Sequence, residues 1–387
     1  MGKLLNNSSL LALATLIGTI VGAGIFGLPY ALSQSGVLLG LLYFILLGGI
    51  ILLLHLLFGE FALRTEKNYR LPGYAFRYLG PKGKYAATFA ILFSIAGALL
   101  AYTILGGDFL RIALSPFFQI SELWAAFAFW AILSFFIFQG IHVIARAEMV
   151  MVAILFGTVG LITFFAIPNI DSANFSVFGE MEFFLPYGVL LFALAGWSAI
   201  PEIAALLKNK KDKARLDNII VWASLSTIVL YAVFTFSVVG VSGQATSEDA
   251  LSGLVPFLGG KIVMLGALFG LVAVAASFLV LGNYLKNSLR YDFGFPYLWA
   301  ACIAVFTPLL LFLGGVRSFP LVMDIVGAIS LGAIEGVLIV LIYKKAKRRG
   351  DRKPEYDLKI PLFVLVGLAV VLTGGAVIKG AHIAGLF

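Results

Sequence analysis

The sequence predicts an all-α membrane protein in which two repeats of five helices cross the bilayer in opposite orientations and an eleventh helix follows them. Hydrophobic residues make up 61% of the 387 residues, and charged residues make up only 12%. The mean hydropathy is +1.05, a value that water-soluble domains of this size do not reach. Two apolar runs that glycine and proline interrupt at corresponding places indicate the repeats.

Eleven apolar runs are long enough to cross about 30 Å of hydrocarbon. We expect one transmembrane domain, in which spans 1 to 5 (about 8–168) are repeated by spans 6 to 10 (about 183–343) and an extra helix follows at about 361–386. Because each repeat has an odd number of crossings, the second repeat is inverted in the membrane. The individual runs lie at 8–33, 36–63, 84–114, 122–140, 143–168, 183–206, 217–243, 259–287, 295–315, 319–343 and 361–386.

The basic residues, which give a net charge of +8, lie mostly in short gaps between the apolar runs. With the N-terminus in the cytoplasm, the only Lys and Arg residues on the outer side are Arg111, Lys261, Arg317 and Lys379. The positive-inside rule therefore predicts a multi-pass protein of the inner (plasma) membrane with a cytoplasmic N-terminus and an extracytoplasmic C-terminus. Charge dispersed in this way argues against nucleic acid as a partner. The single cysteine, Cys302, excludes an intramolecular disulfide, and no cofactor is expected.

The first interrupted run extends from Gly18 to Pro29 and reads GTIVGAGIFGLP. Each glycine in a helix interior costs about 1 kcal/mol and a proline about 3 kcal/mol, so this stretch is poor helix material. An unwound backbone at bilayer depth persists only where protein or a wet cavity surrounds it. We therefore expect a broken helix that lines a binding site. The alternative is close helix packing, because Gly18 and Gly22 are four residues apart.

The second interrupted run is in span 6, where Ala193 to Glu202 reads ALAGWSAIPE. Gly196 lies in its middle and Pro201 follows five residues later, much as Pro29 follows Gly24 in span 1. Discontinuous helices at corresponding positions of inverted repeats are typical of substrate sites at the membrane midplane. The second interruption therefore favours the binding-site interpretation of both.

Three stretches resemble the amino acid/auxin permease family, and particularly its bacterial aromatic and hydroxy amino acid permeases. They are VGAGIFGLPYA in span 1, ALAGWSAIPEI in span 6 and AASFLVLGNYLKNSLRYDFG through span 8. This family belongs to the amino acid, polyamine and organocation superfamily. The resemblance covers nearly the whole chain and implies a 5+5 inverted-repeat transporter fold, with an amino acid as the transported partner and the lipid bilayer as the surroundings.

An amino acid carries a carboxylate and an ammonium on one carbon, and broken helices offer a group for each. The half-helix after the first break exposes the N–H groups of Ala23, Gly24 and Ile25, which suit an anion. Gly22 and Gly24 lack side chains, so the carboxylate can reach the backbone. The carbonyl groups freed at the breaks, which can accept the ammonium, are those of Ile20, Phe192, Ala193 and Leu194.

Selectivity must come from residues around the side chain of the substrate. The first candidates are Trp197 and Ser198, next to Gly196, and the second are Tyr102 and Ile95 of span 3. Ordinary packing is the alternative role for Trp197. None of these residues is an acid or a base, which favours a neutral amino acid.

The coupling ion is H⁺ or Na⁺. Sodium-dependent proteins of this fold hold the ion between spans 1 and 8, where the carbonyls of Gly18 and Val21 and the hydroxyl of Ser277 match. Hard cations take about five or six oxygen ligands, and Ala276 stands where a threonine is common in similar permeases. Resemblance to bacterial members favours the proton, so we expect proton-coupled uptake by alternating access, with exchange or sodium symport as alternatives.

Ionisable residues inside spans are functional candidates because their burial in hydrocarbon is expensive. Glu202, which follows the second break, and Glu335, which lies deep in span 10, are the candidates for carrying the proton. The others lie nearer to span ends, where interfacial or paired structural roles are expected. They are His55, Glu60, Asp108, Glu148 and Asp324.

An intramembrane enzyme is the alternative from another class. Asp108 and Asp292 faintly resemble an aspartyl pair, but the predicted topology puts them at opposite membrane surfaces, and no P-loop or nucleophile elbow is present. A channel is the third possibility and predicts ion conduction that does not depend on a substrate. The sequence therefore predicts a transporter and not an enzyme.

Overall fold

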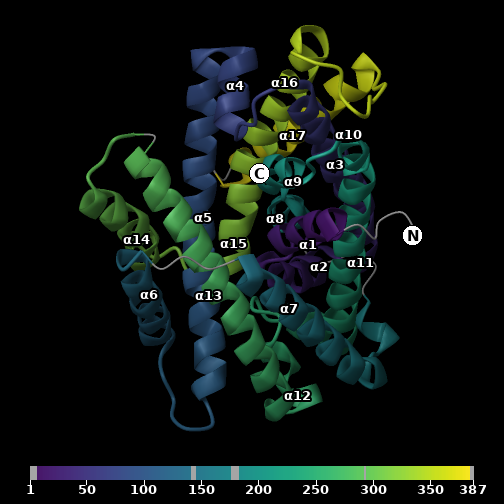
Figure 1. The fold of residues 1–387 in the computed structure, drawn as a ribbon. Coiled ribbons are helices and arrows are strands. Elements are labelled where there is room, and N and C mark those ends of the chain that lie inside the picture. The colour runs from purple at the N-terminus through teal and green to yellow at the C-terminus, as the bar shows by residue number, and fades with distance from the viewer. Residues whose placement is uncertain (1–6, 141–144, 176–182, 292, 384–387) are drawn as a thin grey trace.

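The structure is a computed structural model that describes residues 7–140, 145–175, 183–291 and 293–383 (Figure 1). Within these ranges the chain forms helices and no β-strand. Asp292 lies outside the described residues, and so does the side chain of Glu148.

The first half of the chain contains three parts of the first span, four long helices and one short helix. Its elements are α1 (Asn7–Ile20), η1 (Ala23–Phe26), α2 (Gly27–Ser35), α3 (Val37–Arg64), α4 (Leu71–Leu79), α5 (Pro81–Leu114), α6 (Glu122–Phe138), α7 (Ala145–Ala166), η2 (Ile167–Asn169) and η3 (Ser172–Asn174).

The second half repeats this pattern and adds the last helix. Its elements are α8 (Leu185–Leu194), η4 (Trp197–Ala199), α9 (Ile200–Leu206), α10 (Lys210–Lys213), α11 (Leu216–Ser242), η5 (Gly243–Ala245), η6 (Ser252–Leu254), α12 (Val255–Leu258), α13 (Gly260–Tyr291), α14 (Tyr297–Leu313), α15 (Phe319–Ile325), η7 (Val326–Gly336), α16 (Val337–Arg349) and α17 (Leu362–Ile383).

Among the described residues, seven helical stretches are long and apolar enough to cross a membrane, and the bent pair 8–20 and 23–35 makes an eighth span. Three shorter apolar helices, Glu122–Phe138, Ala153–Asn169 and Tyr297–Leu313, occupy the remaining predicted spans. The prediction of an all-α polytopic membrane protein is confirmed.

Both predicted breaks are present. α1 ends at Ile20, and Gly22 is extended (φ −130°, ψ −158°) before η1 begins. The helical segments on either side of this break meet at an angle of 47°. In span 6, α8 ends at Leu194, and η4 begins after Gly196. The glycines therefore interrupt the helices in the two places where the sequence indicates it.

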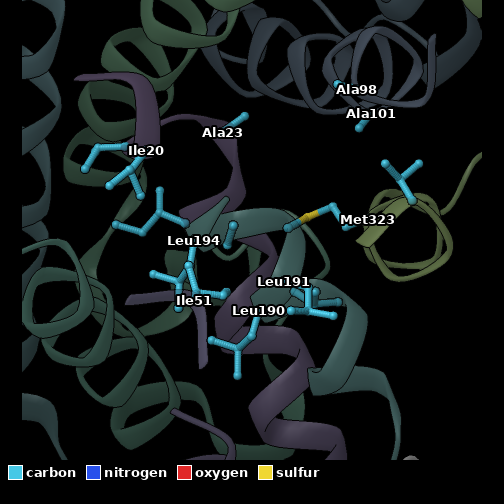
Figure 2. Packing of buried hydrophobic residues seen from close by; sticks show 14 of the residues in the cluster. Ile20, Ala23, Ile51, Ala98, Ala101, Leu190, Leu191, Leu194 and Met323 are labelled. Carbon is cyan, nitrogen blue, oxygen red and sulfur yellow. The ribbon is translucent and has the colours of Figure 1, made fainter. Parts of the chain in front are cut away.

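The two breaks pack against each other inside the bundle. Ile20 and Ala23 of the first break and Leu194 of the second belong to one cluster of buried hydrophobic side chains. Figure 2 shows these residues together with Met323 of α15 and Ala98 of α5. The unwound segments are therefore enclosed by protein, as an unwound backbone at bilayer depth requires.

The tenth span is not the uniform α-helix that the sequence suggests. Its central part, η7, is a π-helix, a widened form that frequently occurs at functional sites. A side chain at Gly327 would place its Cβ 1.8 Å from the carbonyl oxygen of Gly188, so the backbones of η7 and α8 are in direct contact. η7 also carries Glu335.

The two ends of the bundle differ in charge. At the top of Figure 1 lie α4, α10 and the connection 350–361, and we call this the basic end because its connections carry most of the Lys and Arg residues. At the bottom lie α12 and the connection between α5 and α6, and we call this the acidic end for its residues Glu122, Glu248 and Asp249.

Glu60, an acid inside span 2, holds the connection 350–361 against the basic end. Its buried carboxylate accepts hydrogen bonds from Arg64 Nε (2.7 Å) and from the N–H of Leu358 (2.6 Å). Lys347 lies 3.3 Å from it and also pairs with Asp357 at 2.5 Å. The hydrogen bond from Lys347 holds the pKa of Asp357 below its usual value. Glu60 therefore has a structural partner, as its place near a span end indicates.

Lys379, one of the four basic residues expected on the outer side, has a buried side chain that forms an ion pair with the fully buried Asp324. Lys379 belongs to α17 and Asp324 to α15, so the pair joins the eleventh helix to the tenth span.

Replacing Lys379 by methionine should destabilise the protein, because Asp324 would keep a buried charge without its cation. Loss of one partner of a buried pair costs about 3–5 kcal/mol. The double variant Asp324→Asn, Lys379→Met should recover most of this loss, and Lys359→Met in the exposed connection should change little. Thermal unfolding in detergent gives the melting temperatures of these three variants and of the parent. Equal melting temperatures for Lys379→Met and the double variant would contradict the pairing.

Candidate functional site

A cavity of about 330 Å³ lies at the two breaks, between α1, α5, α8, α9, α13 and η7. Most of the predicted site residues line it, and these are Gly18, Ile20, Val21, Gly22, Gly24, Ile95, Tyr102, Phe192, Ala193, Gly196, Trp197, Ser198, Glu202, Ser277 and Glu335. Ala23, Ile25 and Leu194 do not line it, because their side chains are buried in the surrounding core. Only their main-chain groups could take part in binding.

The two glycines of the first break differ in what surrounds them. A Cβ at Gly22 would meet only the hydroxyl of Tyr102, at 3.8 Å, so this glycine borders open space. A Cβ at Gly24 would lie 2.7 Å from Cα of Ala193. Gly22 thus leaves the backbone accessible, whereas Gly24 lets the two breaks touch. The close-packing alternative, which was argued from Gly18 and Gly22, is therefore wrong for Gly22, and Gly24 makes the close contact instead.

Three hydroxyl groups surround the first break. Tyr102 of α5 and Ser277 of α13 both line the cavity there. Tyr231 of α11 donates to the carbonyl oxygen of Ile20 at 2.9 Å. Ile20 was predicted to accept an ammonium group, and only one lone pair of its carbonyl remains for that. Tyr102 lies beside Gly22, at the end of the cavity where the helical segment after the first break begins.

The helical N-terminus after the first break is partly engaged. The N–H of Ile25 bonds weakly to the carbonyl of Gly22, at 3.5 Å. The N–H groups that open a helix have no partner within it, and the positive end of the helix dipole lies at the same place. Together with the Tyr102 hydroxyl, these groups make a site suited to a carboxylate.

His55 of α3 satisfies a main-chain group in the second break. The N–H of Gly196 donates to His55 Nε2 at 3.1 Å, and His55 Nδ1 lies 3.1 Å from Ser224 Oγ. Because an N–H can only donate, Nε2 must be the nitrogen without a proton, and Nδ1 carries the proton and donates to Ser224. The fully buried imidazole is therefore neutral and has a fixed tautomer.

Trp197 is held by Glu335 of η7. Its indole N–H donates to Glu335 Oε2 at 2.8 Å. The other carboxylate oxygen accepts from Ser94 at 3.2 Å and from Ser330 at 3.5 Å. Hydrogen bonds to an ionised group are roughly twice as strong as neutral ones. The carboxylate of Glu335 thus connects the second break to α5.

Glu202 lies at the mouth of the cavity. Its side chain is 62% exposed, and its carboxylate is 3.8 Å from the guanidinium of Arg70. The same guanidinium lies 4.5 Å from the centre of the Tyr284 ring. Arg70 directly precedes α4 and Leu71 begins it, and both line the cavity, so the cavity extends to the basic end.

Three buried aromatic side chains pack together where the segment after the first break begins. Phe26 of η1 packs edge-on against Phe109 of α5, with ring centroids 4.8 Å apart, and against Phe234 of α11 at 5.8 Å. All three are fully buried.

The candidate cation ligands Gly18, Val21 and Ser277 border the same cavity. The Ser277 hydroxyl donates to the carbonyl of Ala273 at 3.1 Å, within its own helix. In the described part of the chain no group of three or more His, Cys, Asp or Glu side chains could hold a metal ion. A cation here would therefore depend on main-chain and hydroxyl oxygens.

Sequence reasoning missed several lining residues. Ile91, Ser94 and Ala98 join Ile95 and Tyr102 along one stripe of α5. Their spacing of three or four residues is the helical period that puts side chains on one face, and this signal was in the sequence. Nothing in the sequence indicated that Arg70, Leu71 and Tyr284 would meet at the cavity mouth.

Replacing Gly24 by alanine should destabilise the protein by about 1–3 kcal/mol, the usual range for overpacking, because the new Cβ would collide with the backbone of Ala193. Gly22→Ala is the matched control. Its φ of −130° is open to any residue, and its new Cβ has room, so its melting temperature should stay close to that of the parent. Thermal unfolding that ranks the two variants in the opposite order would contradict the packing described here.

One protein family and two individual relatives are similar to this chain. The family described as "Transmembrane amino acid transporter protein" matches residues 6–378. Glutamine transporter 2 of Aliivibrio fischeri is 22% identical over 280 residues, which cover 70% of this chain and 72% of that protein. Tyrosine-specific transport system 1 of Haemophilus influenzae is 25% identical over 282 residues, which cover 68% of each chain.

The fold matches that of a solved structure. The crystal structure of MhsT in complex with L-phenylalanine superposes with a TM-score of 0.67 at 14% identity, covering 97% of this chain and 98% of that one. This superposition confirms the predicted 5+5 inverted-repeat fold with broken first and sixth spans. The family match over residues 6–378 shows that the chain belongs to the transmembrane amino acid transporter family.

Proposed function

We propose that the chain takes up neutral amino acids across the inner membrane by alternating access and couples this uptake to protons. The observation that carries the proposal is that two broken helices face one cavity with exposed peptide groups. In this mechanism the two predicted repeats, about 8–168 and 183–343, would move relative to each other. The relatives whose names specify glutamine and tyrosine, and the neighbour with bound L-phenylalanine, support a neutral substrate.

The substrate would bind with its two charged groups at the two breaks. Its carboxylate would lie between Gly22, the N–H groups of Ala23 to Ile25, and the Tyr102 hydroxyl. Its ammonium would face the last carbonyls of α8, those of Phe192, Ala193 and Leu194, which have no partner within the helix. Helix dipoles favour both placements, since the N-terminal end is positive and the C-terminal end negative.

The charges around the cavity support a neutral side chain. Among the described lining residues, Arg70 and Glu202 are at the mouth and already lie close to each other. Glu335 is deeper but is engaged by Trp197, Ser94 and Ser330. A cationic or anionic side chain would therefore find no charge free to neutralise it, and burying it unpaired would be costly.

The distribution of basic residues supports a cytoplasmic location of the basic end. The N-terminus would then be cytoplasmic and the C-terminus extracytoplasmic. Because the cavity extends to the basic end, the structure would correspond to an inward-facing state. Uptake would require the Phe26, Phe109 and Phe234 cluster to separate and the mouth at Arg70 to close.

Glu335 is the better of the two candidates for carrying the proton. Its carboxylate is buried on the cavity wall and bonds directly to Trp197 in the second break. Protonation would remove a charge from the membrane interior and weaken the bond to a residue beside the substrate. The side chain of Glu202 is exposed, so gaining or losing a proton there would not change the amount of charge buried in the membrane interior. Sodium at Gly18, Val21 and Ser277 is the second candidate, because these residues border the same cavity.

Replacing Glu335 by glutamine should abolish proton-driven accumulation, because glutamine keeps the shape and hydrogen-bonding oxygen of glutamate but takes up no proton. Exchange of labelled for unlabelled amino acid across the membrane should continue. The measurement is uptake of each of the twenty amino acids into proteoliposomes under separate pH and sodium gradients.

The matched comparison is Glu202→Gln, which should retain proton-driven accumulation. Loss of accumulation in Glu202→Gln alone would move the proton site to the cavity mouth. Accumulation that follows the sodium gradient would overturn proton coupling, and uptake insensitive to both gradients would indicate an exchanger.

A further inference from the structure

The end of α8 lacks the hydrogen bonds that usually close a helix. In common helix ends, the N–H of the second residue beyond the helix turns back to the carbonyl one or two residues before the last helical residue. For α8, which ends at Leu194, this N–H belongs to Gly196 and the carbonyls to Phe192 and Ala193. Glycine is the usual residue there because the turn needs a left-handed conformation.

Gly196 does not make this turn. Its φ is −146° and its ψ is 7°, outside the left-handed region. Its N–H donates instead to His55 Nε2 at 3.1 Å. Phe192 and Ala193 both line the cavity. Their carbonyls therefore do not receive the hydrogen bond that the N–H of Gly196 would donate in the usual turn.

His55 is well placed to maintain this arrangement. Its side chain is fully buried, and Ser224 of α11 fixes the opposite ring nitrogen at 3.1 Å. Ile51, one turn earlier on α3, belongs with Leu190 and Leu194 of α8 to one buried cluster (Figure 2). The imidazole is therefore held on a rigid support that also contacts α8.

We propose that His55 is a positioning residue that keeps the last carbonyls of α8 available to the substrate ammonium by capturing the N–H of Gly196. The proposal rests on the proposed function, because it assigns those carbonyls to the ammonium. Without an acceptor at position 55, the N–H of Gly196 would turn back onto α8 and compete with the substrate for the same carbonyls. His55 touches no substrate in this account and acts through Gly196.

The test compares three proteins in proteoliposomes, using the amino acid that the parent protein accumulates most strongly. His55→Leu removes the acceptor and should raise KM about tenfold or more, the effect of losing a hydrogen bond to a charged group, with turnover changed less than threefold. His55→Gln supplies a carbonyl oxygen that can accept from Gly196, and its KM should return to within about threefold of the parent. A general packing defect would lower the amount of folded protein and the turnover and would leave KM unchanged.

An unchanged KM in His55→Leu, or a KM in His55→Gln as high as in His55→Leu, would overturn the proposal and leave the transport function intact. Absence of amino acid uptake by the parent would instead contradict the proposed function.

If His55→Leu fails to fold, nitrogen-15 NMR of the parent histidines provides the second measurement. His142→Gln and His382→Gln remove the other two histidine signals. The remaining signal should show the neutral ring with its proton on Nδ1, and a proton on Nε2 would overturn the proposal.

Discussion

The structure depends on one constraint: peptide groups that leave a helix inside a membrane must find other partners, since lipid offers none. Two spans of this chain break at bilayer depth, and most of the specific contacts around the cavity serve those breaks. Tyr231 donates to the carbonyl of Ile20 in the first break, and His55 accepts from the N–H of Gly196 in the second. The peptide groups left over at the two breaks are the ones suited to a zwitterion.

The partners of the breaks come from elements around them, which links the site to the rest of the fold. α11 contributes to both breaks, through Tyr231 directly and through Ser224 by way of His55. Glu335 holds Trp197 from a π-helical segment whose backbone touches α8 at Gly188. A change at the cavity would therefore alter contacts of spans 2, 7 and 10 together, which suits the alternating access proposed for this chain.

The helical architecture and the general place of the site could be predicted because both depend on local features. Apolar runs define the spans, and glycines near prolines mark the breaks. The local signal did not reveal which glycine borders open space, since the close approach of Ala193 to Gly24 and not to Gly22 is a contact between distant parts of the sequence. Contacts between residues distant in sequence, such as His55 with Gly196 and Asp324 with Lys379, are set by packing and had no sequence signal. The stripe along α5 could have been found from its period, because Ile91, Ser94, Ala98 and Tyr102 follow helical spacing.

The most direct test of the central claim is an experimental structure with a transported amino acid bound. The account predicts that the carboxylate lies within hydrogen-bonding distance of the N–H groups that open η1, beside Gly22, and that the ammonium faces the last carbonyls of α8. An amino acid held by side chains away from both breaks, or bound outside the cavity between them, would contradict it.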